Sequence, residues 1–382
     1  MTAAAGSLPR RGGADLRVAV VGAGLMGTSL ALALRQQGWP VWVHDRDARA
    51  QRLAADVSDA QQGIPAEADL VFLAVPPEAT AAVAVEQLRL MPHATVSDVA
   101  STKAHFQVEI ESREGIPDRF VGGHPIAGRE RSGPDAARGD LFEGRPWVLT
   151  PGPAVPGWRM AQVVRAVSAT GALPVVWSAA AHDAAMAAVS HVPQVVASAL
   201  AAQLLLEPAE VVELAGSGLR DTTRIAASDP DLWLGILESN ADAVADRVRA
   251  VSADLAALAD ALDPPAENRE ADKSTQRHAA RPQEADATVR DLLTRGNAGQ
   301  HRIPGKHGEA PIEYAVVPVV ITDAPGSLAR LFSAAGDAGV NVEDVSIEHS
   351  PGQPVGLVEL SVAPEAAQAL REGLVRAGWS VH

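Results

Sequence analysis

The first residue that could do chemistry is His124, which stands between a glycine pair and a proline in "FVGGHPIAGRE" (residues 120–130). Glycine and proline favour turns, so we expect His124 on a shaped turn rather than on the face of an ordinary helix. An imidazole titrates near neutral pH and can serve as a general acid or base. The simpler alternative is a buried histidine that hydrogen-bonds the backbone.

A second pattern is glycine-rich. In "VGAGLMG", Gly22, Gly24 and Gly27 form G-x-G-x-x-G, with Leu25 and Met26 between the last two glycines. An apolar strand pattern precedes the glycines and a helix pattern follows, which is the context of a dinucleotide-binding loop. The first glycine would make the tight turn, the second would admit the pyrophosphate, and the third would let helix and strand pack. The helix N-terminus would offer N–H groups to the phosphates. The alternative is a glycine-rich turn of some other α/β protein.

Asp45 stands at the end of the next expected strand, eighteen positions after Gly27. A carboxylate at this place would accept hydrogen bonds from the adenosine ribose and repel a 2′-phosphate, which favours NAD over NADP. The neighbouring Arg46 weakens that preference.

Polar residues also gather where another strand should end. The stretch "SDVASTK" (97–103) would bring Asp98, Ser101 and Lys103 to the carboxyl edge of the sheet, where ligands bind. For Asp98 and Lys103, polar capping of the strand end is the favoured interpretation. His191 stands in an apolar helical segment two residues before Pro193, and by itself it fits a core histidine better than a ligand.

Arg220 and Arg224 are spaced i, i+4, so we expect them on one helix face. Two like charges repel there, and a shared anion such as a carboxylate would relieve the repulsion. A solvated pair, or salt bridges to residues such as Asp221, is equally consistent with the spacing.

The elements that must position these residues follow from hydrophobic periodicity. Strand patterns alternate with helical patterns and occupy 16–22, 40–45, 68–76, 94–101, 120–125, 145–151 and 172–178. This alternation predicts an α/β Rossmann-type, doubly wound, mostly parallel sheet domain over 16–180. Residues 181–263 lack strand patterns and predict an all-helical domain, in which Asp229 and Pro230 mark one helix start.

The last part of the chain changes character twice. Residues 264–311 are polar, charged and interrupted by Pro and Gly, so we expect a linker with one short helix at 286–295. Strand patterns return over 312–382 in the order βαββαβ, which predicts a ferredoxin-like sandwich. Residues 1–15 are expected to form a disordered tail.

Composition narrows the classes of protein and partner that fit this chain. The 382 residues suffice for two or three domains, and the formal net charge of −15 argues against nucleic acid or an anionic membrane as partner. The absence of cysteine excludes disulfides, a thiolate nucleophile and cysteine metal sites. We find no secretion signal and no uninterrupted apolar run of membrane-spanning length, so a soluble cytoplasmic protein without a metal site is expected.

Together these residues resemble bacterial prephenate dehydrogenases of tyrosine biosynthesis, arogenate dehydrogenases included. The resemblance covers about residues 16–263 and is carried by "VGAGLMGTSLALAL", "DVASTK", "GGHPIAG", "GPDAARGDLFEGRPWVLTP", "HDAAMAAVSHVP" and "GLRDTTRIAASDPDLW". Ser217 departs from the family, which often has a third glycine there. The stretches "TDAPGSLARLF" and "GVNVEDVSIEH" resemble an ACT domain, a module that usually binds amino acids as regulatory ligands.

The resemblance implies NAD-dependent oxidative decarboxylation of prephenate to 4-hydroxyphenylpyruvate. It implies that His124, with a pKa near neutrality, takes the proton of the C4 hydroxyl, and that Ser101 hydrogen-bonds near that hydroxyl and the nicotinamide. Arg224 would bind a substrate carboxylate, and His191 and Arg220 would lie at the far end of the substrate. A homodimer through the helical domain and tyrosine as a possible ligand of the ACT domain are also implied.

Three alternatives remain at this level. The same fold could act on arogenate and make tyrosine directly. A β-hydroxyacid or imine reductase shares "GLMG" but lacks "GGHPIAG" and "TTRIAASDPDLW". A non-catalytic amino-acid sensor would be expected to have lost His124, Ser101 or Arg224, and all three are present.

Overall fold

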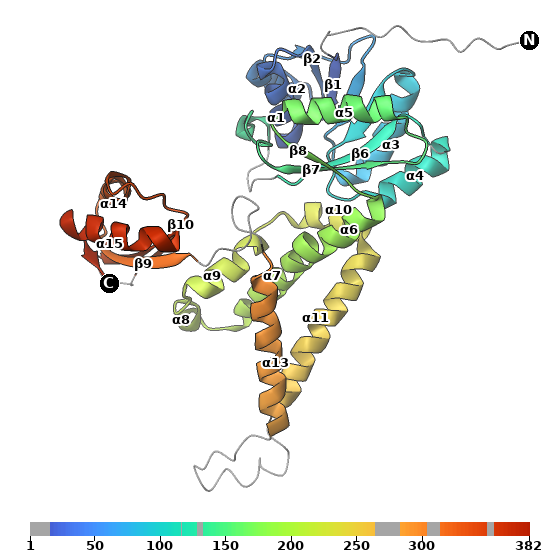
Figure 1. The fold of residues 1–382 in the computed structure, drawn as a ribbon. Helices are drawn as coiled ribbons and strands as arrows, with labels where there is room; N and C mark the ends of the chain where they lie inside the picture. Colours follow the sequence, from blue (N-terminus) through green and yellow to red (C-terminus); the bar gives the residue numbers. More distant parts are fainter. Residues whose placement is uncertain (1–15, 116, 128–132, 264–282, 304–313, 350–354) are drawn as a thin grey trace, which may run out of the picture. The chain divides into compact units, whose positions relative to one another are not determined.

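The computed structural model describes residues 16–115, 117–127, 133–263, 283–303, 314–349 and 355–382 (Figure 1). The expected tail at 1–15 and most of the expected linker at 264–311 lie outside these ranges. The chain divides into two compact units, Met1–Val251 and Ser252–His382.

The first unit contains an eight-stranded sheet in the order β3-β2-β1-β4-β5-β6-β7-β8. Neighbouring strands are parallel except for the antiparallel pair β6 and β7. The predicted Rossmann-type, mostly parallel sheet is therefore confirmed. The two-residue β3 was not predicted, because two residues are too few to show a strand period. The strands are β1 (Val18–Val21), β2 (Val41–His44), β3 (Gln61–Gln62), β4 (Leu70–Leu73), β5 (Thr95–Asp98), β6 (Phe120–Pro125), β7 (Pro146–Pro151) and β8 (Leu173–Val176).

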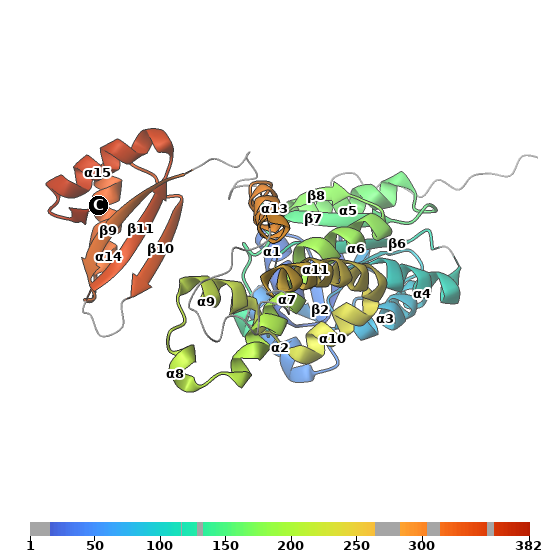
Figure 2. The ribbon, with the colours of Figure 1, turned by 90° about the horizontal axis from the view of Figure 1, so that it is seen from below.

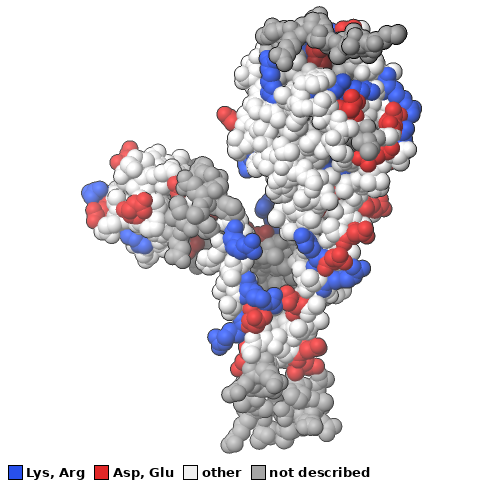
Figure 3. All heavy atoms as spheres, turned by 45° about the vertical axis from the view of Figure 1, so that its right-hand side comes forward, with Lys and Arg blue, Asp and Glu red and all other residues white. Residues whose placement is uncertain are grey.

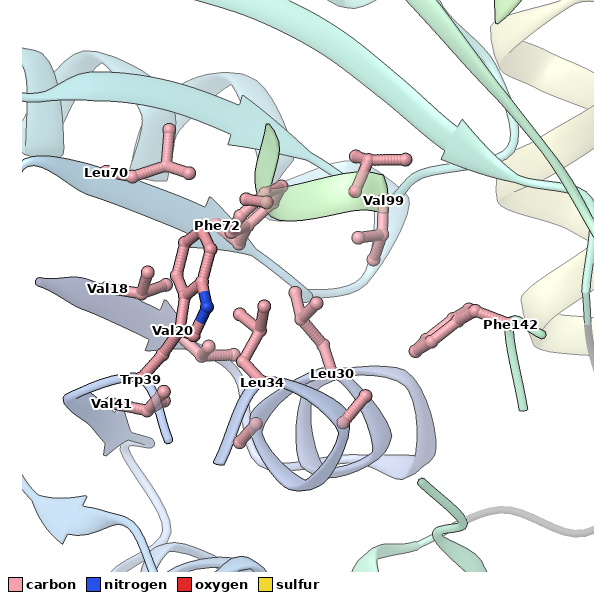
Figure 4. Packing of buried hydrophobic residues seen from close by; sticks show 14 of the residues in the cluster. Val18, Val20, Leu30, Leu34, Trp39, Val41, Leu70, Phe72, Val99 and Phe142 are labelled. Carbon is pink, nitrogen blue, oxygen red and sulfur yellow. The ribbon is translucent and has the colours of Figure 1, made fainter. Parts of the chain in front are cut away.

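Helices cover both faces of this sheet, which explains why its central strands are apolar throughout rather than alternating. One buried cluster packs one set of alternate strand residues against α1, and a second packs the other set against α3 and α4. Figure 4 shows Leu30 and Leu34 of α1 pointing toward the strands that carry Val20 and Phe72. The helices are α1 (Leu25–Gln36), α2 (Ala48–Ser58), α3 (Pro77–Leu90), α4 (Ala104–Glu114) and α5 (Gly157–Ala169).

The rest of the first unit is helical, as predicted. At the predicted start of α10, the Asp229 carboxylate accepts a hydrogen bond from the N–H of Asp231, and Pro230 is the first helical residue. The elements are α6 (Ala179–Met186), a π-helical turn (Ala187–His191), α7 (Val192–Gln203), a 3-10 turn (Leu204–Leu206), α8 (Ala209–Val212), α9 (Ser217–Thr223), a 3-10 turn (Arg224–Ala226), α10 (Pro230–Ser239) and α11 (Ala241–Leu262), which continues into the second unit.

One helical stretch contradicts the expectation that no apolar segment reaches membrane-spanning length. Residues Ala179–Leu206 run on through the π-helical turn for 28 residues with mean hydropathy 1.4, long and apolar enough to cross a membrane by length and composition alone. His191 and the proline after it widen one turn instead of ending the helix. Val189, Leu205 and Leu206 expose most of their surface. This stretch therefore presents apolar side chains that stay exposed among the residues that the structure describes.

The second unit pairs the end of α11 with α13 (Gln283–Gln300), which is longer than the predicted helix. The Arg295 guanidinium binds Asp254 of α11 at 2.9 Å and Asp291 of its own helix at 2.8 Å. In the view of Figure 3, acidic and basic side chains are interspersed over the surface.

A small sandwich follows in the predicted βαββαβ order, and its antiparallel sheet has the strand order β10-β11-β9-β12. Val317, Leu331 and Leu370 belong to its buried core, between the sheet and its two helices (Figure 2). Its main elements are β9 (Ala315–Thr322), α14 (Ser327–Asp337), β10 (Asp344–His349), β11 (Val355–Val362), α15 (Ala367–Arg376) and β12 (Ser380–Val381).

Candidate active site

The glycine loop between β1 and α1 has two glycines that the fold demands and one that it does not. Gly22 has a φ of +108°, and a Cβ there would lie 2.2 Å from the carbonyl oxygen of Ala74. A Cβ on Gly27 would lie 2.0 Å from the carbonyl oxygen of Gly22. Gly24 is exposed, and a Cβ there would meet no protein atom within 4 Å. The space over Gly24 suits a ligand whose phosphates approach the backbone.

The start of α1 completes this loop. Gly24 is its N-cap and supplies no side-chain cap, so the N–H groups of Leu25, Met26 and Gly27 point from an uncapped helix N-terminus. The carboxylate of Asp45, just after β2, accepts a hydrogen bond from the N–H of Ala23 at 2.7 Å. The half-buried Asp45 therefore lies against the loop, where a ribose would follow the phosphates. These residues fit a dinucleotide.

The second group of polar residues lies at the end of β5 and just after it. Asp98 and Lys103 are both buried and form an ion pair. Lys103 Nζ also donates to the carbonyl oxygen of Gly123 at 2.7 Å, and Asp98 accepts from the N–H of Gly123 at 3.0 Å. The pair thus holds the neighbouring strand as well as its own strand end. Ser101 is half-buried, and its hydroxyl has no hydrogen-bond partner in the part of the chain that the structure describes.

His124 is the next-to-last residue of β6, opposite Val148 of β7, so the expected turn begins only after it. Its Nδ1 lies 2.8 Å from Nε2 of His182. Nδ1 of His182 in turn lies 2.7 Å from the carboxylate of Asp183. Asp183 is fixed from behind, because it also accepts from the N–H of Lys103 at 2.9 Å. Two imidazoles and a carboxylate therefore form a continuous chain of hydrogen bonds.

This chain assigns the ring protons. A carboxylate only accepts, so Nδ1 of His182 must donate to Asp183, and Nε2 of a neutral His182 must accept. Nδ1 of His124 then donates to His182. The lone pair of a neutral His124 is left on Nε2, which is the atom able to take a proton from a ligand.

The pKa of His124 differs from the expectation. Burial of the ring and then the positive charge of Lys103 lower this pKa well below its ordinary value, and His182 and His191 would lower it further whenever they carry a proton. The expected pKa near neutrality was therefore wrong, because it ignored burial and a cation brought in from another segment. His124 is consequently a neutral imidazole at physiological pH.

His191 joins the same cluster from the π-helical turn. Its Nδ1 lies 3.2 Å from the amide nitrogen of Asn240, which also donates to the backbone oxygen of Asp183 at 2.8 Å. The ring of Trp233 packs edge-on with its centroid 6.1 Å away. Burial lowers the pKa of His191, so this ring is also neutral at pH 7.

The two arginines are placed differently from the expectation. α9 ends at Thr223 and Arg224 opens a 3-10 turn, so the two do not share one uninterrupted helix face. The hydroxyls of Thr222 and Thr223 bond carbonyls one turn back, a contact that often bends a helix. Arg220 and Arg224 are exposed, and the described contacts join neither of them to the His124 cluster.

Sequence reasoning missed three members of this cluster, namely His182, Asp183 and Asn240. The adjacent "HD" at 182–183 was the only available signal, since a buried imidazole next to a carboxylate suggests a fixed tautomer.

Comparison with known proteins agrees with this geometry. Residues 30–176 match the model of the prephenate dehydrogenase nucleotide-binding domain, and residues 178–275 match that of the prephenate dehydrogenase dimerization domain. The probable prephenate dehydrogenase NovF of Streptomyces niveus is 35% identical over 94% of this chain and 98% of its own. The chain belongs to the prephenate dehydrogenase family. It is an NAD-binding oxidoreductase.

Two solved structures are similar over most of their length. Prephenate dehydrogenase from Aquifex aeolicus, in complex with hydroxyphenyl propionate and NAD+, is 27% identical with a TM-score of 0.62, covering 75% of this chain and 99% of that one. Synechocystis arogenate dehydrogenase is 26% identical with a TM-score of 0.60, at 75% and 99% coverage. The family-model match begins at residue 30, after the glycine loop, so the loop is assigned here by its own geometry.

Proposed function

We propose that the protein oxidises prephenate with NAD+ to 4-hydroxyphenylpyruvate, carbon dioxide and NADH. The observation that carries this proposal is the chain from Asp183 through His182 to His124, which leaves Nε2 of His124 as a neutral, oriented base. It lies at the end of the sheet where ligands of this fold bind, as does the glycine loop.

The protein residues would divide the work by position. His124 Nε2 takes the proton of the C4 hydroxyl, and the hydrogen bond to His182 keeps that nitrogen deprotonated beforehand. Ser101, whose hydroxyl has no partner in the described part of the chain, hydrogen-bonds near the same hydroxyl. The dinucleotide held by the glycine loop would supply the acceptor for the hydride of C4. Loss of the ring carboxylate as carbon dioxide leaves an aromatic product, so the residues mainly orient the substrate.

The far end of the substrate carries the remaining charge. We propose that Arg224 binds a substrate carboxylate, with Arg220 and His191 at the same end. The 3-10 turn of Arg224 is followed by Ser228, whose hydroxyl lies 3.4 Å from Gln194, three residues after His191. This contact joins the residues after the Arg224 turn to the helix that starts after His191, and it supports a common end for Arg224 and His191.

The test is NADH absorbance with purified protein, NAD+ and either prephenate or arogenate. Turnover with prephenate supports the proposal. Turnover with arogenate alone would move the enzyme to the alternative that makes tyrosine directly, in line with the similarity to arogenate dehydrogenase. No turnover with either substrate, repeated with NADP+, would refute both and favour the amino-acid sensor.

We also propose that a second copy of the chain covers the exposed apolar side chains of Ala179–Leu206, since this region matches a dimerization domain. Light scattering should then give twice the chain mass of 39.6 kDa. A monomer at micromolar concentration would contradict the proposed homodimer.

The βαββαβ sandwich is proposed to be an ACT domain that binds tyrosine. An open cavity of about 490 Å³ on it is lined by Arg330, Asp337 and Trp379, which could meet a carboxylate, an ammonium group and a ring. Equilibrium dialysis with labelled tyrosine tests this, and Arg330→Ala should abolish binding. Equal binding by that variant would move the ligand elsewhere.

A further inference from the structure

The strand that carries His124 leaves its parallel neighbour just before the histidine. β5 and β6 pair only at Val96 with Phe120 and at Ser97 with Val121, although β6 continues to Pro125. On the other side, β6 stays paired with β7 as far as Pro125. The backbone around His124 is therefore held by strand hydrogen bonds on one side only.

The Asp98–Lys103 pair takes the place of the missing strand hydrogen bonds. Both polar groups of the Gly123 backbone are bound, the N–H by Asp98 at 3.0 Å and the carbonyl by Lys103 at 2.7 Å. A Cβ on Gly123 would lie 2.5 Å from the backbone oxygen of Asp98, so this contact requires a glycine. The residue before His124 has no freedom to shift while the ion pair is intact.

Lys103 also reaches the other end of the hydrogen-bond chain. Its backbone N–H donates to the Asp183 carboxylate at 2.9 Å, and Asp183 orients His182. The side chain of Lys103 thus fixes the backbone just before His124. The backbone N–H of Lys103 fixes the His124 ring, through Asp183 and His182.

We propose that Lys103, paired with Asp98, is a positioning residue that fixes the strand carrying His124 and, through Asp183 and His182, the orientation of the His124 ring. The inference rests on the proposed role of His124 as the base. The ionisable groups around the ring come from three segments: Asp98 at the end of β5 with Lys103 after it, His182 and Asp183 on α6, and His191 in the π-helical turn.

Lys103 also acts on the charge of the His124 ring, because both groups are positive when protonated. The Lys103 ammonium opposes a second positive charge on His124 and lowers its pKa, after burial itself. Burial lowers the pKa of Lys103 too, and Asp98 opposes that shift, which helps the lysine to stay charged. Asp98 is therefore needed both as a contact to Gly123 and as a counter-ion.

The test compares Lys103→Met with Lys103→Arg, which keeps the charge. In Lys103→Met the acid limb of the kcat/KM profile should move to higher pH, and kcat should fall on the order of tenfold to a hundredfold as His124 loses its alignment. Lys103→Arg should keep the acid limb near that of the wild type. A folded Lys103→Met protein with the wild-type limb and kcat would overturn the inference.

The matched control is Arg159→Met. Arg159 is another buried cation, on α5, and its guanidinium donates to the backbone oxygen of His93 and the hydroxyl of Thr95, at the start of β5 rather than its end. Its loss should lower the melting temperature without moving the acid limb. An equal move of the limb in this control would show that general destabilisation is the cause, and would refute the specific role of Lys103.

A second readout needs no substrate. The imidazole of His124 can be titrated by NMR of histidine-labelled protein, with His124→Asn to assign its signal. Its pKa should rise in Lys103→Met whether or not prephenate is oxidised, so inactivity with a shifted titration would refute the proposed function alone. An unshifted titration in an active enzyme would refute the inference alone. If Lys103→Met does not fold, Asp98→Asn combined with Lys103→Met removes both buried charges, and the same outcomes apply.

Discussion

The glycine loop and the His124 cluster lie in the same unit, yet they are built by opposite means. The loop depends on glycines, which have no side chain. Gly22 and Gly27 leave room for the neighbouring backbone, and Gly24 leaves room for a ligand. The cluster uses buried polar side chains from distant segments, such as Lys103 and Asp183, 80 positions apart. A substitution in the loop should therefore affect only the loop and its ligand. A substitution in the cluster should disturb the other residues of its hydrogen-bond chain as well.

The sharpest way to separate the two is His124→Asn. Removing the base should lower kcat on the order of a thousandfold, because general base catalysis is worth about 10² to 10⁴. The Kd for NAD+ should stay within about twofold, since the loop shares no contact with the ring. Stopped-flow turnover and quenching of tryptophan fluorescence measure the two quantities. A parallel loss of NAD+ affinity would show that loop and cluster are coupled.

His182→Gln tests whether the cluster acts as a network. The glutamine can still meet Asp183 but does not hold the His124 ring in one tautomer, so kcat should fall about tenfold or more with little change in KM. The matched control is His105→Gln, because His105 is exposed and lies 3.9 Å from its carboxylate partner, Glu109. The control should keep wild-type kcat. A wild-type kcat in His182→Gln as well would leave His124 acting alone.

Gly24→Ala and Gly27→Ala sharpen the description of the loop. An alanine at 24 meets no protein atom, so the melting temperature should hold while the Kd for NAD+ rises about tenfold. An alanine at 27 must displace the Gly22 backbone and should destabilise the fold by about 1–3 kcal/mol. Calorimetry and NAD+ titration give both numbers. Loss of stability in Gly24→Ala would show that Gly24 serves the fold rather than the cofactor.

The same contrast explains what could be predicted from the sequence. The strands other than the two-residue β3, the glycine loop and the start of α10 depend on patterns within about twenty residues, and these were predicted. Asp98 and Lys103 were read as strand-end caps, because nothing local shows that they bind Gly123. His182, Asp183 and Asn240 were missed, and the lowered pKa of His124 with them, because burial and long-range contacts exist only in the folded chain. Arg224 lies in a 3-10 turn instead of on the expected helix face, directly after two threonines whose hydroxyls bond carbonyls one turn back, and the i, i+4 spacing alone does not show where a helix ends.

The smallest expected effect is on stability against pH. The pKa values of His124 and His191 are both lowered by burial from their ordinary value of 6.5. Below that pH the unfolded chain binds protons that the folded chain does not, so the free energy of unfolding should fall as the pH drops from 6.5 toward 5. Above pH 7 both states are neutral at these rings, and the term should vanish.

Thermal melting between pH 5 and 8 measures this effect. In His124→Asn the melting temperature should depend less steeply on pH than in the wild type. The matched comparison is His105→Gln, whose exposed ring should leave the slope unchanged. The glycine loop carries no group that titrates in this range, so Gly24→Ala should melt with the wild-type slope. If the steep slope survives in His124→Asn, the proton responsible binds to His191 or to another group. Protonation of His124 would then not be the cause of the pH dependence.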